Sequence, residues 1–360
     1  MTKKTPLFDE HLQCDGRIVD FEGWLMPVQY SSILEEHRAV RTAAGLFDVS
    51  HMGEFFVSGK ACATWLNGIL TNDAAKLSMG QCHYTFLLNE QGGVIDDLIL
   101  YRLEEEKFLL IVNASKIDEN FEWMLSKKSG TVVLENASDD YAAVALQGPN
   151  SVKILERMIA GQVELPKRNR IVLWKYNGEE IWISRTGYTG EDGFECFFSQ
   201  KIAAEFWRKI LEEGKELGCA AAGLGARDLL RLEACLPLNG HDLSPEITPI
   251  EAGFEKFVSL EKKEHFPGRT ALENNPPRRA LIAFVMSENG ALPRGHCAVY
   301  RGEEKIGEVT SGGISPMLQK GIGLALVERE RSQIGNEILI EVRGKKLPAM
   351  IQPRPLYKKL

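Results

Sequence analysis

The chain lacks the charge balance and the apolar runs that would point to nucleic acid or to a membrane. Its 360 residues include 43 basic and 50 acidic side chains, a formal net charge of −7. A nucleic-acid-binding surface needs a basic stripe that replaces phosphate counterions, which argues against nucleic acid as a partner. No apolar run approaches the ~18–20 residues of a membrane span, and the basic N-terminus lacks the apolar stretch of a signal peptide. We therefore expect a cytoplasmic protein.

Signals for metal, redox and nucleotide chemistry are also missing. The seven cysteines are odd in number and form no C-x-x-C pair, which favours buried reduced thiols. There is no phosphate loop, no G-x-S-x-G elbow and no H-E-x-x-H motif. Gly223 and Gly225 begin a dinucleotide fingerprint, but Asp228 stands where its third glycine belongs. His51 and Glu54 would hold a metal together only on a helix, and the glycine between them predicts a strand or turn.

Length and periodicity predict several α+β domains, because a single core stops growing near ~250–300 residues. Ser32 and Glu35 form a capping box for a helix that ends before Gly45. Strands over 83–89, 94–103 and 108–113 form an antiparallel meander, as in a split βαβ domain. Further helices are predicted over 61–70, 117–127, 152–160 and 201–217, and another has Arg227 in its first turn and runs to about Ala234. Further strands are predicted over 142–147, 172–176 and 180–185, the last two around an Asn177-Gly178 turn.

After Pro249 the chain changes to short strands separated by glycine turns. This pattern predicts a β-rich C-terminal domain. The predicted turns are Asn289-Gly290, Arg301-Gly302, Ser311-Gly312-Gly313 and Arg343-Gly344.

Two adjacent aspartates, Asp96 and Asp97, lie inside an otherwise apolar strand. The strand period of two sends them to opposite faces, and a buried carboxylate costs several kcal/mol unless it is paired. One interpretation is a bulge near the turn that leaves both groups in solvent. The other is a carboxylate tuned to orient an amine or exchange protons with it.

The segment 184–195, SRTGYTGEDGFE, has glycines at every third position from Gly187 to Gly193. Glycine allows tight turns and close approach of the backbone to a ligand. Tyr188 lies between small residues with room to stack on a planar ligand, and Glu195 re-enters a strand between apolar neighbours. A long decorated hairpin is the structural alternative.

The segment 220–232, AAAGLGARDLLRL, places Arg227 in the first turn of a helix, where a cation opposes the helix dipole. Asp228, Arg231 and Glu233 would form a routine surface network on that helix. If Arg227 points inward instead, it needs an anionic or carbonyl partner.

Together these segments resemble the aminomethyltransferase family, the T-protein of the glycine cleavage system. The resemblance runs over nearly the whole chain, and several long motifs occur in the family's order. They are TPLFDEH at 5–11, VDFEGWLMPVQY at 19–30, GLFDVSHMGEF at 45–55, LTNDAAKL at 70–77, GGVIDDLILYR at 92–102, LQGPNS at 146–151, SRTGYTGEDGFE at 184–195, GLGARDLLRLEACLPLNGHDL at 223–243 and GEVTSGGISPML at 307–318.

The resemblance implies an α+β fold with three domains in a cloverleaf around a central folate channel. It implies a discontinuous first domain (1–50 plus 140–240), an inserted ferredoxin-like domain (51–139) that carries Asp97, and a β-barrel or jelly-roll-like domain (241–360). It also implies transfer of an aminomethyl carbon from the lipoyl arm of the H-protein to tetrahydrofolate. The products are 5,10-methylenetetrahydrofolate, ammonia and the dihydrolipoyl carrier, with no metal and no flavin.

Matched position by position, the family's catalytic aspartate falls on Asp97, expected near N5 and N10 of the folate. Glu195 matches the acid that recognises the pterin, whose 2-amino group and N3–H are the donors that a carboxylate accepts. The other matches are a folate-contacting arginine at Arg227, aromatic residues of the folate cavity at Tyr84 and Tyr188, and wall residues at Asn113 and Met52.

Two relatives share the fold without the transfer reaction. One is a folate-dependent demethylase with altered site residues. The other is a non-enzymatic folate binder in iron–sulfur cluster assembly, whose K-G-C-[YF]-x-G-Q motif this chain lacks around Cys82. We also expect the terminal lysines to steer an acidic carrier protein towards the site. These lysines are Lys3, Lys4, Lys358 and Lys359.

Overall fold

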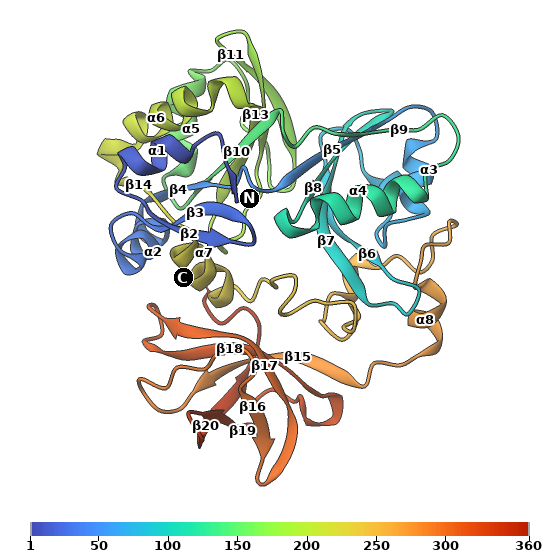
Figure 1. The fold of residues 1–360 in the computed structure, drawn as a ribbon, viewed down its shortest axis with the longest axis vertical. Coiled ribbons are helices and arrows are strands. Elements are labelled where there is room, and N and C mark those ends of the chain that lie inside the picture. The colour runs from blue at the N-terminus through green and yellow to red at the C-terminus, as the bar shows by residue number, and fades with distance from the viewer. Residues whose placement is uncertain (1, 359–360) are drawn as a thin grey trace. The chain divides into compact units, whose positions relative to one another are not determined.

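The computed structural model describes residues 2–358 and has the mixed α+β class that the sequence predicts (Figure 1). Its internal contacts divide it into two compact units. Unit 1 comprises the chain up to Asn67, together with Ala74–Tyr84 and Leu98–Arg227. Unit 2 comprises Gly68–Asp73, Thr85–Asp97 and the chain from Asp228 onward. The division into three domains stays a prediction.

Unit 1 contains a six-stranded sheet covered on one face by two helices (Figure 1). One strand directs every second side chain towards the helices, where these side chains pack against Phe206 and Trp207. They are Phe194, Cys196 and Phe198, so Glu195 belongs to the opposite face of the sheet. In sheet order the strands are β11 (Ile171–Tyr176), β12 (Glu179–Ser184), β13 (Gly193–Ser199), β10 (Tyr141–Gln147), β4 (Ala44–Asp48) and β14 (Cys219–Ala221), and the helices are α5 (Ser151–Ile159) and α6 (Ala203–Gly214).

Local signals of this sheet region are confirmed. Asn177 and Gly178 have φ angles of 50° and 87°, so the β11–β12 hairpin turns where predicted. The helical region before Gly218 consists of α6 with a short 3₁₀ turn at each end, and Gly218 ends it in the left-handed conformation.

The N-terminal part of unit 1 has a small three-stranded sheet and two helices. The sheet comprises β1 (Lys3–Lys4), β2 (Arg17–Phe21) and β3 (Trp24–Gln29), and the helices are α1 (Phe8–Gln13) and α2 (Ile33–Thr42). Ser32 caps α2 by accepting from the Glu35 backbone N–H at 3.2 Å, as predicted. Helix α2 ends at Thr42, before Gly45 as predicted. Gly45 itself is a residue of β4, where a Cβ would lie 2.4 Å from Val40 Cγ2.

A five-stranded sheet contains the predicted meander. Its order is β6 (Cys82–Leu88), β7 (Val94–Glu104), β8 (Lys107–Val112), β5 (Gly53–Ser58) and β9 (Val133–Asn136). Helix α4 (Ile117–Ser126) packs on it, with Phe121 and Phe55 ring centroids 5.4 Å apart. Helix α3 (Cys62–Asn67) is shorter than predicted, because the Asn67 side chain accepts from the Ala74 backbone N–H at 2.7 Å and the chain turns there.

Unit 2 contains a closed barrel, which confirms the β-rich C-terminal domain. Its strands, in barrel order, are β15 (Arg279–Met286), β18 (Lys320–Glu328), β17 (Glu304–Ser315), β16 (Ala298–Arg301), β19 (Glu337–Val342) and β20 (Lys345–Gln352). Helix α8 (Arg269–Asn274) precedes the barrel, and α7 (Leu224–Glu233) begins in unit 1 and ends in unit 2. Within residues 2–358, no helix is long and apolar enough to cross a bilayer.

One predicted barrel turn is wrong. Ser311, Gly312 and Gly313 lie inside β17, next to a register shift between Val309 and Ser311. Gly312 is needed there for packing, because a Cβ would lie 2.6 Å from the Pro293 carbonyl oxygen. The pattern of small residues therefore reflects a bulged strand that another segment approaches closely.

Candidate functional site

The polar centre of unit 1 is Glu195, on the face of β13 away from the helices. Its cross-strand neighbour on β12 is Ser184, and Thr186 follows two residues later on the same side. Thr186 Oγ1 donates to Glu195 Oε2 at 2.5 Å, while Glu195 Oε1 makes no hydrogen bond to a described residue. Burial raises the pKa of the Glu195 carboxyl, and the Thr186 hydrogen bond and the Arg227 charge act in the opposite direction.

The glycines of segment 184–195 make room for a glutamine of β10. A Cβ on Gly187 would lie 1.9 Å from Gln147 Oε1, and one on Gly193 would lie 2.5 Å from Gln147 Nε2. Gln147 in turn accepts from Thr189 Oγ1 at 2.9 Å and donates to the Thr186 carbonyl at 3.1 Å. The close approach predicted for a ligand is therefore made, at these two glycines, by a side chain of the protein.

Two arginines fix the same segment from either side. Arg41 of α2 donates to the Thr189 carbonyl at 2.8 Å and forms a buried ion pair with Glu191 at 2.9 Å. Arg185 clamps Asp192 through Nε and NH2, at 2.9 and 2.5 Å. These charge-assisted contacts restrict the conformation of the segment between Arg185 and Gly193.

Arg227 and Tyr188 form the second half of the site. The Arg227 guanidinium lies over the Tyr188 ring, 4.8 Å from its centroid. Its NH1 is buried and makes no hydrogen bond to any described residue. Burial lowers the pKa of Arg227, against the opposing charge of Glu195. The inward orientation considered for Arg227 is thus the observed one, and NH1 is a donor available to an acceptor.

His51 belongs to this charge environment, which the sequence did not indicate. It lies in a turn after β4, is 3% exposed, and packs edge-on against Phe21 with centroids 5.9 Å apart. Burial lowers its pKa to about 4; Asp48 acts in the opposite sense, and Arg227 lowers it further. His51 is therefore neutral at physiological pH and adds no competing cation beside Arg227.

The remaining predicted residues of unit 1 lie on the meander sheet or directly beside its strands. Tyr84 is a partly exposed residue of β6. Gly53 pairs with Val112, so Met52 and Asn113 leave their strands at the same end of the sheet. Both side chains are partly exposed. Their roles towards a ligand stay predictions.

Asp97 lies in unit 2, in regular strand geometry. Its Oδ1 accepts from Asn239 Nδ2 at 3.3 Å, and the side chain is partly exposed. Asp96, the neighbouring residue of β7, is 0% exposed. The interpretation of a bulge with both carboxylates in solvent is therefore wrong, because β7 is continuous through both aspartates and buries the first.

The network expected on the surface of α7 is largely buried. Arg231 is 3% exposed, and it pairs with Asp242 at 2.8 Å as well as with the more exposed Asp228 at 2.8 Å. Glu233 is 0% exposed and accepts from Ser315 Oγ of β17 at 2.5 Å. These side chains attach α7 to the barrel, which a helical pattern alone does not reveal.

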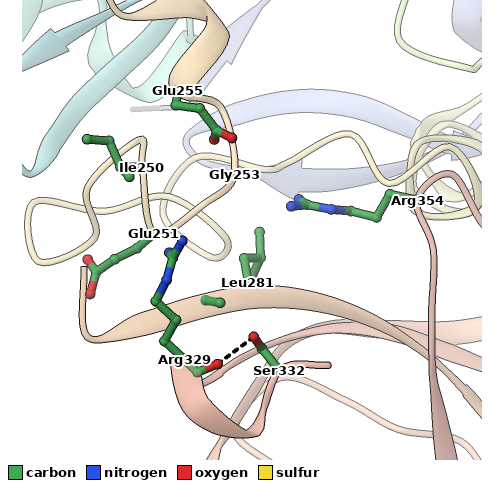
Figure 2. Close-up of a pocket in the computed structure, with 9 residues that line it drawn as sticks. Ile250, Glu251, Gly253, Glu255, Leu281, Arg329, Ser332 and Arg354 are labelled. Atoms are coloured by element: carbon green, nitrogen blue, oxygen red, sulfur yellow. Dashed lines mark hydrogen bonds between the residues drawn. The ribbon is translucent and has the colours of Figure 1, made fainter. Parts of the chain in front are cut away.

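A cavity of about 380 Å³ lies elsewhere in unit 2 (Figure 2). It contains none of the predicted site residues, and its lining includes Arg354 and Glu251. Arg354 donates to the Ala252 carbonyl at 3.0 Å, and Glu251 pairs with Arg279 at 2.9 Å. These two side chains hold the loop that precedes the barrel.

Two of the terminal lysines pack on aromatic rings. Lys3 and Lys4 lie over the rings of Trp24 and Phe8, 5.4 and 4.0 Å from the centroids. Lys358 is exposed, and Lys359 lies outside the described residues. In the described part of the chain, no cluster of three or more His, Cys, Asp or Glu residues is placed to bind a metal ion.

Comparisons with known proteins agree over the whole chain. Residues 7–262 match the family model of the GCVT N-terminal domain, and residues 279–358 match that of the glycine cleavage T-protein C-terminal barrel domain. An aminomethyltransferase of Thermoanaerobacter pseudethanolicus is 47% identical, covering 99% of this chain and 98% of the relative. One of Bacillus cereus is 46% identical with the same coverage.

A solved structure supports the same relationship. The crystal structure of glycine cleavage system aminomethyltransferase T from Bartonella henselae matches with a TM-score of 0.92 and 33% identity. The match covers 99% of this chain and 98% of the solved chain.

Proposed function

Because the chain belongs to the glycine cleavage T-protein family of aminomethyltransferases, we propose that it transfers the aminomethyl carbon from the lipoyl arm of an H-protein to tetrahydrofolate. The carbon leaves the lipoyl sulfur and the amino nitrogen, and bonds to N5 and N10 of the folate. The products are 5,10-methylenetetrahydrofolate, ammonia and the dihydrolipoyl carrier. The co-substrate is the reduced folate itself.

The proposal is carried by one observation: the Glu195 carboxylate and the Arg227 guanidinium act on each other electrostatically, and Arg227 lies over the Tyr188 ring. Glu195 offers an acceptor oxygen without a partner in the described chain, and Arg227 offers a buried donor in the same state. The edge of a pterin ring presents a carbonyl oxygen, an N3–H and a 2-amino group. Glu195 accepts from the two nitrogen donors and Arg227 donates to the carbonyl oxygen, so the donor and acceptor sets are complementary.

Asp97 is the proposed catalytic residue. N5 must be unprotonated when it attacks, and the departing ammonia must take up a proton, so a fixed carboxylate close to both nitrogens assists the step. The hydrogen bond from Asn239 restricts the orientation of the Asp97 carboxylate. Holding the reactants and this carboxylate in one geometry lowers the barrier without any new covalent intermediate on the protein.

The test is ammonia release from an aminomethyl-lipoyl H-protein, measured with and without tetrahydrofolate. We expect release that requires tetrahydrofolate and yields methylenetetrahydrofolate in equal amount. Tetrahydrofolate binding by calorimetry without any release would contradict the proposal and favour a demethylase or a non-enzymatic folate binder. Absence of tetrahydrofolate binding would contradict folate chemistry as a whole.

A further inference from the structure

Thr186 lies at the centre of a cluster of three hydroxyl groups next to Glu195. Besides its bond to Glu195, Thr186 Oγ1 lies 3.2 Å from the Tyr101 hydroxyl and 3.0 Å from Ser184 Oγ. Tyr101 and Ser184 are both 0% exposed, so the protein supplies their hydrogen-bond partners. Tyr101 comes from β7 and is held by an edge-on contact with Phe197 of β13, with ring centroids 5.9 Å apart.

Each hydroxyl group has one proton to donate, and this fixes the direction of the hydrogen bonds among these side chains. An ionised carboxylate only accepts, so the single hydroxyl proton of Thr186 is donated to Glu195. The Thr186 oxygen is then the acceptor at its two other contacts, and a hydroxyl has two lone pairs for this purpose. Tyr101 and Ser184 must both donate to Thr186. All three hydroxyl dipoles therefore point towards the carboxylate and polarise one another.

We propose that Thr186 is a positioning residue of the folate site: backed by Tyr101 and Ser184, its hydroxyl occupies Glu195 Oε2 and leaves Oε1 oriented as the acceptor for the pterin N–H groups. This inference rests on the proposed function, since it concerns how the same site reads its substrate. In this proposal Thr186 contacts the Glu195 carboxylate and not the ligand.

The charges around Glu195 explain why it needs such support. Arg227 from α7 acts on the Glu195 carboxyl, and Glu195 in turn acts on Cys82 from β6, Tyr101 from β7 and the adjacent Cys196. Arg227 is the one cation among them, and burial raises the pKa values of both thiols and of the phenol, so these groups stay neutral. The Thr186 hydrogen bond is the largest influence that lowers the Glu195 pKa against burial.

The experiment compares Thr186→Val, which replaces the hydroxyl by a methyl group, with Thr186→Ser, which keeps the hydroxyl. Tetrahydrofolate affinity is measured between pH 5 and 9 by calorimetry. We expect Thr186→Val to weaken binding at pH 7 by about 10-fold and to shift the acidic limb of the binding curve up by about one pH unit, the scale of one lost hydrogen bond to a charged group. Thr186→Ser should stay within about 2-fold of the wild type at each pH.

A second readout follows the carboxyl group without any ligand. Carbon-13 NMR of labelled glutamate records the titration of Glu195 in the free protein, with Glu195→Gln to assign its signal. We expect the Glu195 titration to move to higher pH in Thr186→Val, and to move by a smaller amount in Ser184→Ala and Tyr101→Phe. An unchanged Glu195 titration in folded Thr186→Val overturns the inference, as does an equal loss of affinity at all pH values.

The binding measurement and the NMR titration distinguish a failure of the inference about Thr186 from a failure of the proposed function. If wild-type protein and Glu195→Gln both fail to bind tetrahydrofolate, the proposed function is wrong, yet the NMR titration still decides whether Thr186 controls the carboxylate. If wild type binds and Glu195→Gln does not, while Thr186→Val matches wild type, the function stands and the positioning role of Thr186 is refuted.

Discussion

Replacing Asp242 by Asn tests how strongly the buried charges of α7 hold this helix to the barrel. Asp242 Oδ2 accepts from Arg231 NH1 at 2.8 Å, from the Leu238 backbone N–H at 2.9 Å and from Ser311 Oγ at 2.9 Å. Oδ1 accepts from Thr310 Oγ1 at 2.5 Å. An asparagine keeps one acceptor oxygen and turns N–H groups towards the other donors. It also leaves the Arg231 guanidinium, whose side chain is 4% exposed, without its fully buried counterion.

Removing one member of a buried ion pair costs about 3–5 kcal/mol, because the remaining charge stays desolvated. Asp228 still contacts Arg231 and offsets part of this loss, so we expect about 3 kcal/mol. Urea unfolding followed by far-UV circular dichroism measures the difference in the free energy of unfolding.

Asp228→Asn is the matched control, because it removes the other counterion of the same arginine. The Asp228 side chain is 49% exposed, so we expect a loss of no more than about 1 kcal/mol. The double variant Arg231→Met with Asp242→Asn should be more stable than Asp242→Asn alone, since it leaves no buried charge without a partner and keeps an acceptor oxygen at position 242. Equal stability of Asp242→Asn and Asp228→Asn would refute the reasoning.

Three further predictions concern carboxylates and a lysine. Asp97→Asn should lower the rate of ammonia release by at least ~10²-fold, and Asp96→Asn much less, because its side chain leaves the opposite face of β7; equal rates in the two variants would contradict this. Burial raises the pKa of Glu54, so above pH ~4.3 the folded state binds more protons than the unfolded state. The free energy of unfolding should therefore fall as pH rises. Urea titrations at several pH values should show this fall in wild type and not in Glu54→Gln. Burial lowers the pKa of Lys262 to about 7, against ~10.4 in the unfolded chain, so the free energy of unfolding should rise between pH 7 and 10 in wild type and stay flat there in Lys262→Met.

Features determined by neighbouring residues were predictable from the sequence. The Asn177-Gly178 turn, the Ser32 cap and the left-handed Gly218 each follow from the backbone preference of one or two residues. The same local signals failed in the Ser311–Gly313 stretch. There the small residues accommodate side chains or backbone from distant segments, which no local pattern contains.

The site itself divides in the same way. The family motifs located Glu195, Arg227 and Tyr188, and the structure brings these three together in unit 1. The supporting shell was not predictable, because its members are far apart in the chain. Tyr101 and Thr186 are separated by 85 residues, and Gln147 lies 42 residues before Thr189. The same holds for the buried Glu233, whose hydrogen-bond donor Ser315 lies 82 residues later in the chain.

The packing of Gln147 between Gly187 and Gly193 has a consequence for how this loop can change during evolution or engineering. A glycine-rich loop usually suggests a segment that tolerates substitution, but here the Gln147 side chain occupies the space beside both glycines. Exchange of Gly187 for alanine requires a shorter residue at 147, and that residue would no longer hold the Thr186 carbonyl. A Cβ at Gly193 would in addition lie 2.7 Å from the Leu146 carbonyl oxygen. Substitutions at positions 147, 187 and 193 therefore depend on one another. A library intended to alter ligand choice should keep them constant, together with Thr189, Glu191 and Asp192, whose contacts hold the loop, and should vary Tyr188.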